Sequence, residues 1–296
     1  MVKIIDGKKI AEKVFKEVKA RLRRVKHRPK LAVVLIGDDP ASKIYVNMKI
    51  KACNRLGIES EVVQLSRKEA EEMVEKEKSR LEREIERLDA DETVTGILVQ
   101  LPLPGNFSSD KIIAGIDPEK DVDCLHPQNL GRFMMGTGRI APCASKGCLR
   151  LLDEYGIKIA GKEAVVVGKS KIVGRPMSRM LLARGARVLS CDKSTKNLAQ
   201  CTKRADILVS AAGEPRLIRK EMVKKGAVVI DVGTTREKTG SKKKSAKGKL
   251  KRGLIGDVCF DEVSEVASAI TPVPGGVGPM TVAMLMENVV ILAENK

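Results

Sequence analysis

Short apolar runs alternate with amphipathic stretches through the second half of the chain. The run 164–167 is all apolar and largely β-branched, which indicates a strand buried on both faces, and three further strands are predicted over 187–191, 206–210 and 227–231. The stretches between these runs have the apolar spacing of helices. Strands that alternate with helices in this way predict an α/β fold with a doubly wound parallel sheet, whose ligands bind at the carboxyl ends of the strands.

The first of these strands is followed by a turn that favours phosphate binding. Gly168 ends the strand, Gly174 and Pro176 follow it, and a helix begins directly after them. A helix that begins behind a glycine-bearing turn points free backbone N–H groups at an anion. Because the spacing is G-x-S-x-x-x-G rather than the usual dinucleotide fingerprint, a tight turn without a ligand stays an alternative.

The first half of the chain has a similar alternation. Strands are predicted over 31–36, 61–65 and 95–99, and helices over 10–25, from residue 41 onward and over 67–89. Tyr45 and Lys49 lie four residues apart in the second helix and therefore share one face, although an ordinary helix surface would have the same spacing. Gln100 is a lone polar residue at the carboxyl end of a buried strand, where α/β proteins hold ligands.

Two further segments have unusual composition. Residues 116–123 are rich in carboxylates and indicate a crossing between domains, after which Ser145 is predicted to cap a helix through residue 152. Residues 271–281 combine three prolines with three glycines and precede a final helix predicted over 282–294. Such a loop lets the backbone approach a flat ligand closely, and a domain linker is the alternative.

The composition narrows the class of protein. A chain of 296 residues favours two domains, and no apolar run reaches the length of about eighteen residues that predicts a membrane span. The N-terminus lacks the apolar segment of a secretory signal, and seven cysteines without a C-x-x-C pair suit a reducing cytoplasm. With only His27 and His126 available, neither a metal site nor a histidine-based triad is expected.

The net charge of +18 raises nucleic acid as a partner. Aromatic residues make up only 2% of the chain, so the stacking platforms of nucleic-acid-binding proteins are almost absent. Part of the excess charge lies in residues 238–252, which contain no acidic residue and indicate a solvated loop or a tether for a polyanion. Nucleic acid is therefore an unlikely partner.

Five segments carry a family resemblance. They are 45–49 (YVNMK), 99–104 (VQLPLP), 118–123 (PEKDVD), 167–176 (VGKSKIVGRP) and 272–281 (PVPGGVGPMT). Together they resemble the bifunctional methylenetetrahydrofolate dehydrogenase/methenyltetrahydrofolate cyclohydrolase family. Each motif is weak alone, but five in the family's order over nearly the whole chain are specific.

The resemblance implies two α/β domains with a cleft between them. Residues 1–118 plus 272–296 would form a three-layer folate-binding catalytic domain, and residues 119–271 a Rossmann-like NADP-binding domain. The resemblance also implies a cytoplasmic homodimer that acts on a folate in one-carbon metabolism. The dehydrogenase oxidises 5,10-methylenetetrahydrofolate with NADP, and the cyclohydrolase converts the methenyl product to 10-formyltetrahydrofolate.

The resemblance also assigns site residues. The catalytic cleft would contain Tyr45, Lys49, Gln100 and Asp123, with Pro274, Gly275, Gly276 and Val277 close to the folate. The cofactor site would contain Gly168, Lys169, Ser170 and Thr234. Lysine is a poor base at its ordinary pKa of about 10.4, but burial and a cationic substrate lower that pKa. We therefore expect Lys49 to be the key group in hydrolysis, with Tyr45 against the pterin and Asp123 accepting hydrogen bonds from it.

Two departures from the family pattern bear on the site. Lys169 replaces the usual Arg; with Lys193 it provides cations for a 2′-phosphate, whereas Asp192 favours the free ribose of NAD. NADP is predicted, with NAD as the alternative. Cys124 replaces the glycine that usually follows Asp123, so an altered turn is expected there.

Three other functions remain open from the sequence alone. A monofunctional methylenetetrahydrofolate dehydrogenase shares most of these motifs, and Lys49 with Gln100 argues for the second activity. A two-domain dehydrogenase of the shikimate or amino-acid type would share the nucleotide domain but not the motif around Gln100. A basic nucleic-acid-binding protein rests on the net charge alone.

Overall fold

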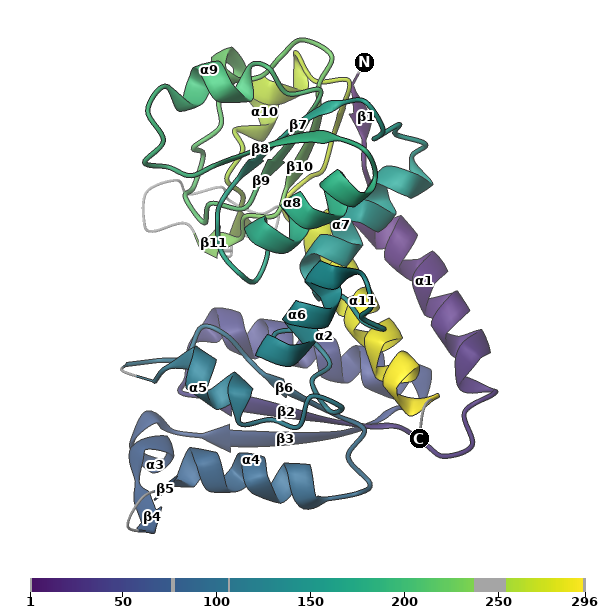
Figure 1. Cartoon of the computed structure of the whole chain (residues 1–296), viewed down its shortest axis with the longest axis vertical. Helices are drawn as coiled ribbons and strands as arrows, with labels where there is room; N and C mark the ends of the chain where they lie inside the picture. The colour runs from purple at the N-terminus through teal and green to yellow at the C-terminus, as the bar shows by residue number, and fades with distance from the viewer. Residues whose placement is uncertain (1, 76–77, 106, 237–253, 295–296) are drawn as a thin grey trace, which may run out of the picture. The chain divides into compact units, whose positions relative to one another are not determined.

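The structure, a computed structural model, describes residues 2–75, 78–105, 107–236 and 254–294. The chain divides into two compact units (Figure 1). The first unit consists of Met1–Ala11 and Ala144–Thr281, and the second of Glu12–Cys143 and Val282–Lys296. Helices α1 (Gly7–Leu22) and α11 (Val277–Ala293) therefore each contribute residues to both units.

The first unit is built on a six-stranded parallel sheet. Its strands are β1 (Lys3–Ile4), β7 (Glu163–Val167), β8 (Arg187–Cys191), β9 (Ile207–Ser210), β10 (Val228–Asp231) and β13 (Ala269–Ile270), in the spatial order β1-β13-β10-β9-β7-β8. Read from β7, the strand order is second, first, third, fourth, fifth, which is a doubly wound order. Its ligand crevice is expected where the order reverses, between the carboxyl ends of β7 and β9.

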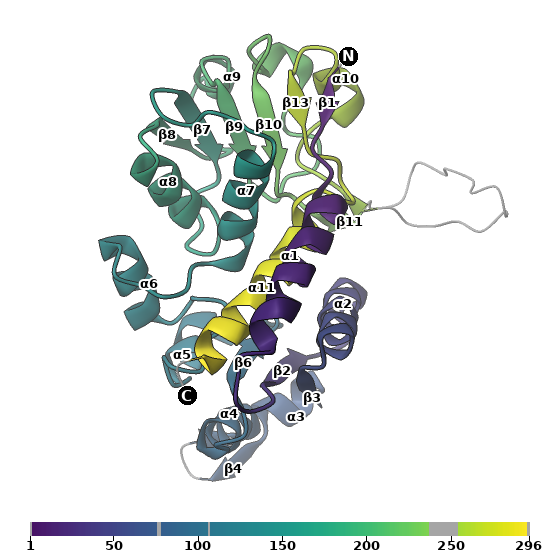
Figure 2. The same cartoon turned by 90° about the vertical axis from the view of Figure 1, so that its right-hand side faces the viewer.

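Helices cover both faces of this sheet (Figure 2). They are α7 (Cys143–Glu154), α8 (Gly174–Ala183), α9 (Leu198–Thr202) and α10 (Phe260–Ser264), with a 3-10 turn at Lys220–Met222 and a short antiparallel pair, β11 (Thr235–Arg236) with β12 (Leu254–Ile255). Helices α9 and α10 pack on the face that carries Val165, Val167 and Leu208. Strand β7 is buried on both sides, as its apolar run predicted, and so is β9, whereas the edge strand β8 has two exposed residues.

The second unit has a smaller parallel sheet of β2 (Lys30–Ile36), β3 (Glu59–Leu65) and β6 (Gly96–Val99), in the order β3-β2-β6. Helix α2 (Pro40–Leu56) lies on one face and α4 (Arg80–Ala90) on the other, which gives three layers (Figure 1). Alternate residues of β2, beginning at Ala32, pack against Leu81, Ile85 and Leu88 of α4. Shorter helices α5 (Ser109–Ala114) and α6 (Pro127–Met135) complete the unit.

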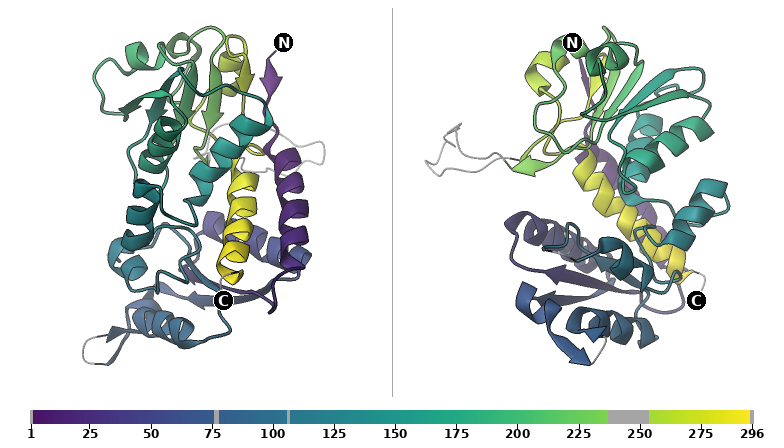
Figure 3. Two further views of the ribbon diagram at one scale, coloured as in Figure 1. Left: turned by 45° about the vertical axis from the view of Figure 1, so that its right-hand side comes forward. Right: turned by 60° about the vertical axis from the view of Figure 1, so that its left-hand side comes forward.

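Two helices that are distant in sequence are joined within the second unit. Helices α1 and α11 run side by side (Figure 3). Arg21 donates to Glu294 from Nε at 3.0 Å and from Nη2 at 2.6 Å, and its Nη1 lies 3.7 Å from Glu287. Helix α11 is apolar on nearly all sides, and most of its residues are buried.

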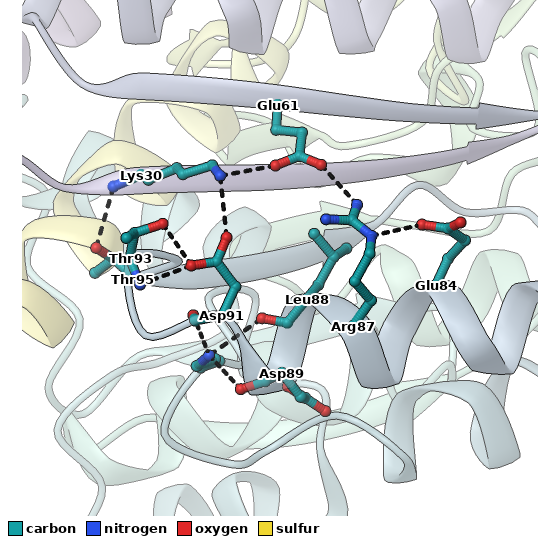
Figure 4. A network of polar contacts seen from close by, with 10 residues as sticks. Lys30, Glu61, Glu84, Arg87, Leu88, Asp89, Asp91, Thr93 and Thr95 are labelled. Carbon is teal, nitrogen blue, oxygen red and sulfur yellow. Dashed lines mark hydrogen bonds and ion pairs between the residues drawn. The ribbon is translucent and has the colours of Figure 1, made fainter.

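A polar network closes one end of the small sheet (Figure 4). Lys30 Nζ bridges Glu61 at 2.8 Å and Asp91 at 3.2 Å, and Glu61 also accepts from Arg87 at 2.6 Å. Lys120, only 6% exposed, extends its Nζ to three backbone carbonyls at the end of α4: Leu88 at 3.1 Å, Asp89 at 2.5 Å and Asp91 at 2.8 Å. The lysine of the PEKDVD segment is thus a cap for a helix C-terminus.

Most predicted elements are confirmed, but three predictions are wrong. The long helix expected over 67–89 is two helices, α3 (Arg67–Glu71) and α4, separated by the hairpin β4 (Met73–Glu75) and β5 (Lys78–Ser79). Ser66 and Ser79 each form a capping box, so each starts its own helix. Charge periodicity alone did not reveal these two starts.

The other two corrections concern helix starts. Helix α7 begins at Cys143, so Ser145 lies inside it, and its hydroxyl donates to Val173 O at 3.1 Å. Helix α11 begins at Val277, five residues before the predicted start, because Gly278 and Pro279 fall in the first turn, where proline is tolerated. The helix predicted over 10–25 ends at Leu22. The basic segment 238–252 lies outside the described residues.

Candidate active site

Lys49 and Gln100 meet inside the second unit. Lys49 lies on the buried side of α2 with 8% of its surface exposed, and its Nζ donates to Gln100 Oε1 at 2.8 Å. Gln100 directly follows β6, and its amide donates to Leu101 O at 2.6 Å, which fixes the orientation of its carbonyl oxygen. A lysine amine is therefore held in place at the carboxyl end of a parallel strand.

Asp123 is the charge that faces this amine. Burial lowers the pKa of Lys49, and the neighbouring charge of Asp123 opposes that shift. Burial likewise raises the pKa of Asp123, opposed first by Lys49 and then by hydrogen bonds from the thiol and the backbone N–H of Cys143. The structure thus brings Lys49, Gln100 and Asp123 together, in an environment that disfavours a free charge on either ionisable group.

Asn288 and Cys143, which the sequence patterns did not single out as site residues, hold this cluster. Asn288, fully buried in α11, donates from Nδ2 to Val122 O at 2.9 Å, Ala141 O at 3.0 Å and Cys143 Sγ at 3.4 Å. It therefore ties together the segments that carry Asp123 and Cys143. The available signal was an amide inside a largely apolar helix.

The turn after Asp123 has a backbone conformation that favours glycine. Cys124 adopts a φ of 57°, in the left-handed region, and its buried thiol donates to Ile140 O at 3.6 Å. The turn therefore keeps a conformation that glycine adopts freely, and Cys124 occupies it with a side chain. A left-handed conformation costs a non-glycine residue about 1 kcal/mol or more. Asp121 supports the same turn by accepting from the backbone of Leu125 and His126.

Other predicted folate-site residues are placed separately. Tyr45 is half-buried on α2, one turn before Lys49. The loop residues Pro274, Gly275, Gly276 and Val277 belong to the first unit. There Gly275 O accepts from Lys8 N at 3.2 Å, and Gly276 N donates to Pro272 O at 2.8 Å, which fixes the loop ahead of α11.

The first unit places the predicted cofactor turn at the reversal of its strand order. Gly168 follows β7 with a φ of 129°, and a side chain there would overlap Ala211 O, directly after β9. A side chain at Gly174 would overlap Gly168 O. Ser170 Oγ accepts from Val173 N at 3.2 Å, and α8 begins at Gly174. The glycines keep the turn compact at the start of a helix, where a dinucleotide-binding fold holds an anion.

Ion pairs surround the end of the neighbouring strand. Lys169 Nζ lies 3.0 Å from Asp192 Oδ2, and Lys193 Nζ lies 3.2 Å from Glu214 Oε2. Asp192 Oδ1 accepts from Ser194 N at 3.0 Å and from Ser194 Oγ at 2.7 Å. These hydrogen bonds, with Lys169, hold the pKa of Asp192 well below its usual range. Thr234, the last predicted cofactor residue, is exposed beyond β10.

A buried pair of carboxyl groups lies behind the same strand ends. Asp231 accepts from the backbone N–H groups of Gly233, Asp257 and Val258, each at 3.0 Å. Asp257 Oδ2 accepts from Ser210 Oγ at 3.1 Å and Ala212 N at 2.7 Å. Burial raises the pKa of Asp231 to about 7 despite these donors, and Asp257 adds to the rise. The pair fixes the loops that follow β9 and β10.

The described residues offer no group of three or more His, Cys, Asp or Glu side chains that would hold a metal ion. Within residues 2–75, 78–105, 107–236 and 254–294, no helix is long and apolar enough to cross a membrane.

A doubly wound unit with a glycine-bearing turn, in one chain with a buried Lys49–Gln100–Asp123 cluster, defines a nucleotide-binding α/β enzyme. The sequence model of the tetrahydrofolate dehydrogenase/cyclohydrolase catalytic domain matches residues 5–123, and that of the NAD(P)-binding domain of the same enzymes matches residues 142–296. The chain therefore belongs to the tetrahydrofolate dehydrogenase/cyclohydrolase family.

Relatives and solved structures agree with this assignment. The chain is 47% identical over 296 residues to the Bifunctional protein FolD of Acetivibrio thermocellus, which covers 99% of this chain and 97% of that protein. The FolD enzyme of Campylobacter jejuni is 44% identical, with a TM-score of 0.87 and coverage of 100% and 99%. The Trypanosoma brucei enzyme, solved with NADP and an inhibitor, is 38% identical, with a TM-score of 0.89 and coverage of 99% and 98%.

The chain is thus an enzyme with dehydrogenase and cyclohydrolase activities and the two-domain α/β fold of its family. The resemblance drawn from the five motifs is confirmed.

Proposed function

We propose that the chain oxidises 5,10-methylenetetrahydrofolate with NADP and hydrolyses the methenyl product to 10-formyltetrahydrofolate. The observation that carries the proposal is the 2.8 Å hydrogen bond from Lys49 Nζ to Gln100 Oε1 beside Asp123. An amine whose pKa is lowered by burial is suited to general-base work near neutral pH. Family membership supplies the folate as substrate.

In the hydrolytic step, the neutral Lys49 amine accepts a proton from the water whose oxygen adds to the methenyl carbon. The resulting ammonium returns a proton to the ring nitrogen as the bond from that nitrogen to the carbon breaks. Gln100 Oε1 holds the amine throughout, and the Asp123 carboxylate stabilises the ammonium once it forms. We assign Tyr45 to packing against the pterin, and Pro274, Gly275, Gly276 and Val277 to the folate site.

The first unit fits a dinucleotide. The compact turn through Gly168, Ser170 and Gly174 ends at the start of α8, the place where a doubly wound fold binds a pyrophosphate. Bound NADP supplies the nicotinamide ring that accepts the hydride. We assign Thr234 to the same site.

The ion pairs beside β8 favour NADP over NAD. Asp192 already uses one carboxylate oxygen for Ser194 and the other for Lys169. A free carboxylate oxygen is what a ribose 2′-hydroxyl requires, so Asp192 is poorly suited to select NAD. Lys169 and Lys193 remain as cations for a 2′-phosphate, to which lysine binds as a point charge.

We extend the proposal to the domain boundaries, the oligomeric state and the cellular compartment. The boundaries expected from the sequence, 1–118 plus 272–296 for the folate-binding domain and 119–271 for the NADP-binding domain, differ from those of the compact units. Residues 119–143, which include Asp123, lie in the unit of Lys49, so we assign them to the folate-binding domain, and residues 1–11 lie in the unit of the six-stranded sheet. A cytoplasmic homodimer is proposed, supported by the family resemblance and by seven free cysteines, which suit a reducing compartment. Light scattering would give a mass of twice 32.2 kDa for the dimer.

The testing experiment measures initial rates with 5,10-methylenetetrahydrofolate and either NADP or NAD, following the absorbance of the methenyl species and its decay. Reduction of NADP with catalysed loss of the methenyl species supports both activities. Hydride transfer without accelerated methenyl loss would leave a dehydrogenase alone. Preference for NAD would overturn the role given to Lys169 and Lys193.

A further inference from the structure

Two cysteines from different elements meet at the end of β8. Cys191 is the last residue of β8, and Cys201 lies in α9. Leu189 and Cys191, two residues apart, point to the same face of the sheet, where they pack with Leu198 and Cys201 of α9. The thiol of Cys191 is hydrogen-bonded to that of Cys201. Hydrogen-bonded sulfur atoms can form a disulfide once the residues that carry them shift toward each other.

The two thiols differ in access. Cys191 is 1% exposed, whereas Cys201 is partly exposed at the surface of α9. A reagent in solution therefore reaches Cys201 first, with Cys191 directly behind it. This pairing of an accessible thiol with a second thiol is the arrangement that redox-sensing proteins use.

The pair brackets the segment that we assign to the cofactor ribose. Asp192, which holds Lys169 at 3.0 Å, follows Cys191 directly, and Lys193 comes next. A bond between the two sulfur atoms would close residues 191–201 into a ring that contains this segment. Disulfide formation draws the sulfurs from hydrogen-bond separation to about 2.05 Å, so Cys191 and the residue attached to it must move.

We infer that Cys191 and Cys201 form a two-cysteine modification site, which reacts with a low-molecular-weight disulfide and thereby weakens NADP binding. The inference rests on the proposed NADP site of the first unit. In the first step the Cys201 thiolate attacks one sulfur of the reagent, and the other half leaves as a thiolate. In the second step the Cys191 thiolate attacks Cys201 Sγ and expels the second half. Two protein thiols are oxidised to one disulfide, and the reagent disulfide is reduced to two thiols.

The second step sets the speed of the modification. Burial and the neighbouring Cys201 raise the pKa of Cys191 to about 11, so little of its thiolate is present at neutral pH. Oxidation is therefore slow at pH 7 and accelerates as the pH rises. Lys169, by its positive charge, partly offsets the rise.

The test uses the full-length enzyme and oxidised glutathione. Intact mass and peptide mapping follow the loss of two hydrogens and the link between Cys191 and Cys201. The KM for NADP is measured before and after oxidation, together with hydrolysis of added methenyltetrahydrofolate, which serves as an internal control for the fold. Cys201→Ser removes the accessible thiol, and Cys259→Ser, at the other partly exposed cysteine, is the matched control.

We expect the 191–201 link, a rise in the KM for NADP of about fivefold or more, and little change in hydrolysis. Dithiothreitol restores the KM, bound NADP slows the oxidation, and Cys201→Ser is insensitive whereas Cys259→Ser behaves as the wild type. A link elsewhere, glutathione adducts without a link, an unchanged KM, or equal loss of both activities would each overturn the inference.

Failure of the proposed function can be distinguished from failure of the inference about the two thiols. It would appear as reduced enzyme that does not turn over NADP at all, whereas the thiol pair is scored by mass and by direct binding of NADP to reduced and oxidised protein.

Discussion

The ammonium of Lys169 lies 3.0 Å from the carboxylate of Asp192, across the ends of two neighbouring strands. Lys169 follows Gly168 at the end of β7, and Asp192 follows the last residue of β8. The acidic residue that the sequence offered as a sign of NAD is therefore the residue that orients a cation. The residue that argued for NAD, Asp192, and the residue that argued for NADP, Lys169, are thus the two partners of one ion pair.

Replacement of that lysine should change cofactor use selectively. Lys169→Ala removes a cation from the proposed 2′-phosphate site, so the KM for NADP should rise about tenfold while the KM for NAD changes little. Steady-state kinetics with both cofactors provides the measurement. Lys162→Ala, at the opposite, amino end of β7, is the control and should alter neither KM. Equal loss with both cofactors would show that Lys169 does not contact the 2′-phosphate.

Replacement of Lys49 should separate the two activities. Lys49→Met should lower the cyclohydrolase rate by about 100-fold or more, because it removes the amine that Gln100 Oε1 holds in place, whereas hydride transfer should persist. Lys43→Met, on the exposed side of the same helix, is the matched control. Full cyclohydrolase activity in Lys49→Met would show that the base lies elsewhere.

The pH profile of hydrolysis tests the same residue by its charge. The base works only as the neutral amine, so the wild-type rate should rise with pH and level off above the pKa of Lys49. Burial lowers this pKa, so the rise should end below the ordinary lysine value of about 10.4. Initial rates from pH 6 to 10 would show this rising limb of the pH profile, and the Lys49→Met variant should lack it. An identical limb in the variant would assign the titration to another group.

Loss of Lys120 should destabilise the second unit. Lys120→Met leaves the carbonyls of Leu88, Asp89 and Asp91 without their shared donor, which should lower the free energy of unfolding by about 2–4 kcal/mol. Urea unfolding would measure the change. Lys43→Met breaks only an exposed pair with Asp38 and should cost less than about 1 kcal/mol. Similar losses in both variants would contradict the capping role.

Asp231 should make the first unit less stable as the pH rises. Its folded pKa of about 7 exceeds the unfolded value, so the folded state binds more protons between about pH 4 and 7. The free energy of unfolding should therefore fall through that window, by up to roughly 4 kcal/mol for a difference of about three pKa units. Urea unfolding at several pH values would show this slope, and Asp231→Asn should reduce it. A stability that rises with pH through the window would indicate that the three backbone donors keep Asp231 ionised.

The sequence predicted seven of the nine strands of the two parallel sheets, because their apolar runs are bounded by glycine and polar turns. Strands β1 and β13 were not predicted, since each is only two residues long. The sequence also predicted Gln100 as a site residue, since a polar residue after a buried strand has few structural reasons to be there. The split of the 67–89 helix was not predicted, because Ser66 and Ser79 look like ordinary polar residues in a charged stretch until their capping boxes are seen.

The support of Asp123 was not predictable from local patterns. Cys143 and Asn288 approach it from segments that are distant in sequence, and neither carries a charge that would single it out. In the same way, the pairing of Cys191 with Cys201 depends on which face of β8 the helix α9 covers. These contacts follow from tertiary packing rather than from local spacing.

The place of Asn288 has a consequence for the order in which the enzyme matures. The carbonyls of Val122 and Ala141 and the thiol of Cys143 are synthesised long before the amide that joins them, which lies five residues before the end of α11 and arrives with the segment Val282–Lys296. While this segment is still inside the ribosome, the chain lacks the hydrogen bonds from Asn288 that hold the segments on either side of Asp123 and Cys143 together. A chain truncated before Asn288 would therefore keep Lys49, Gln100 and Asp123 and lack the amide that ties Val122 to Ala141 and Cys143.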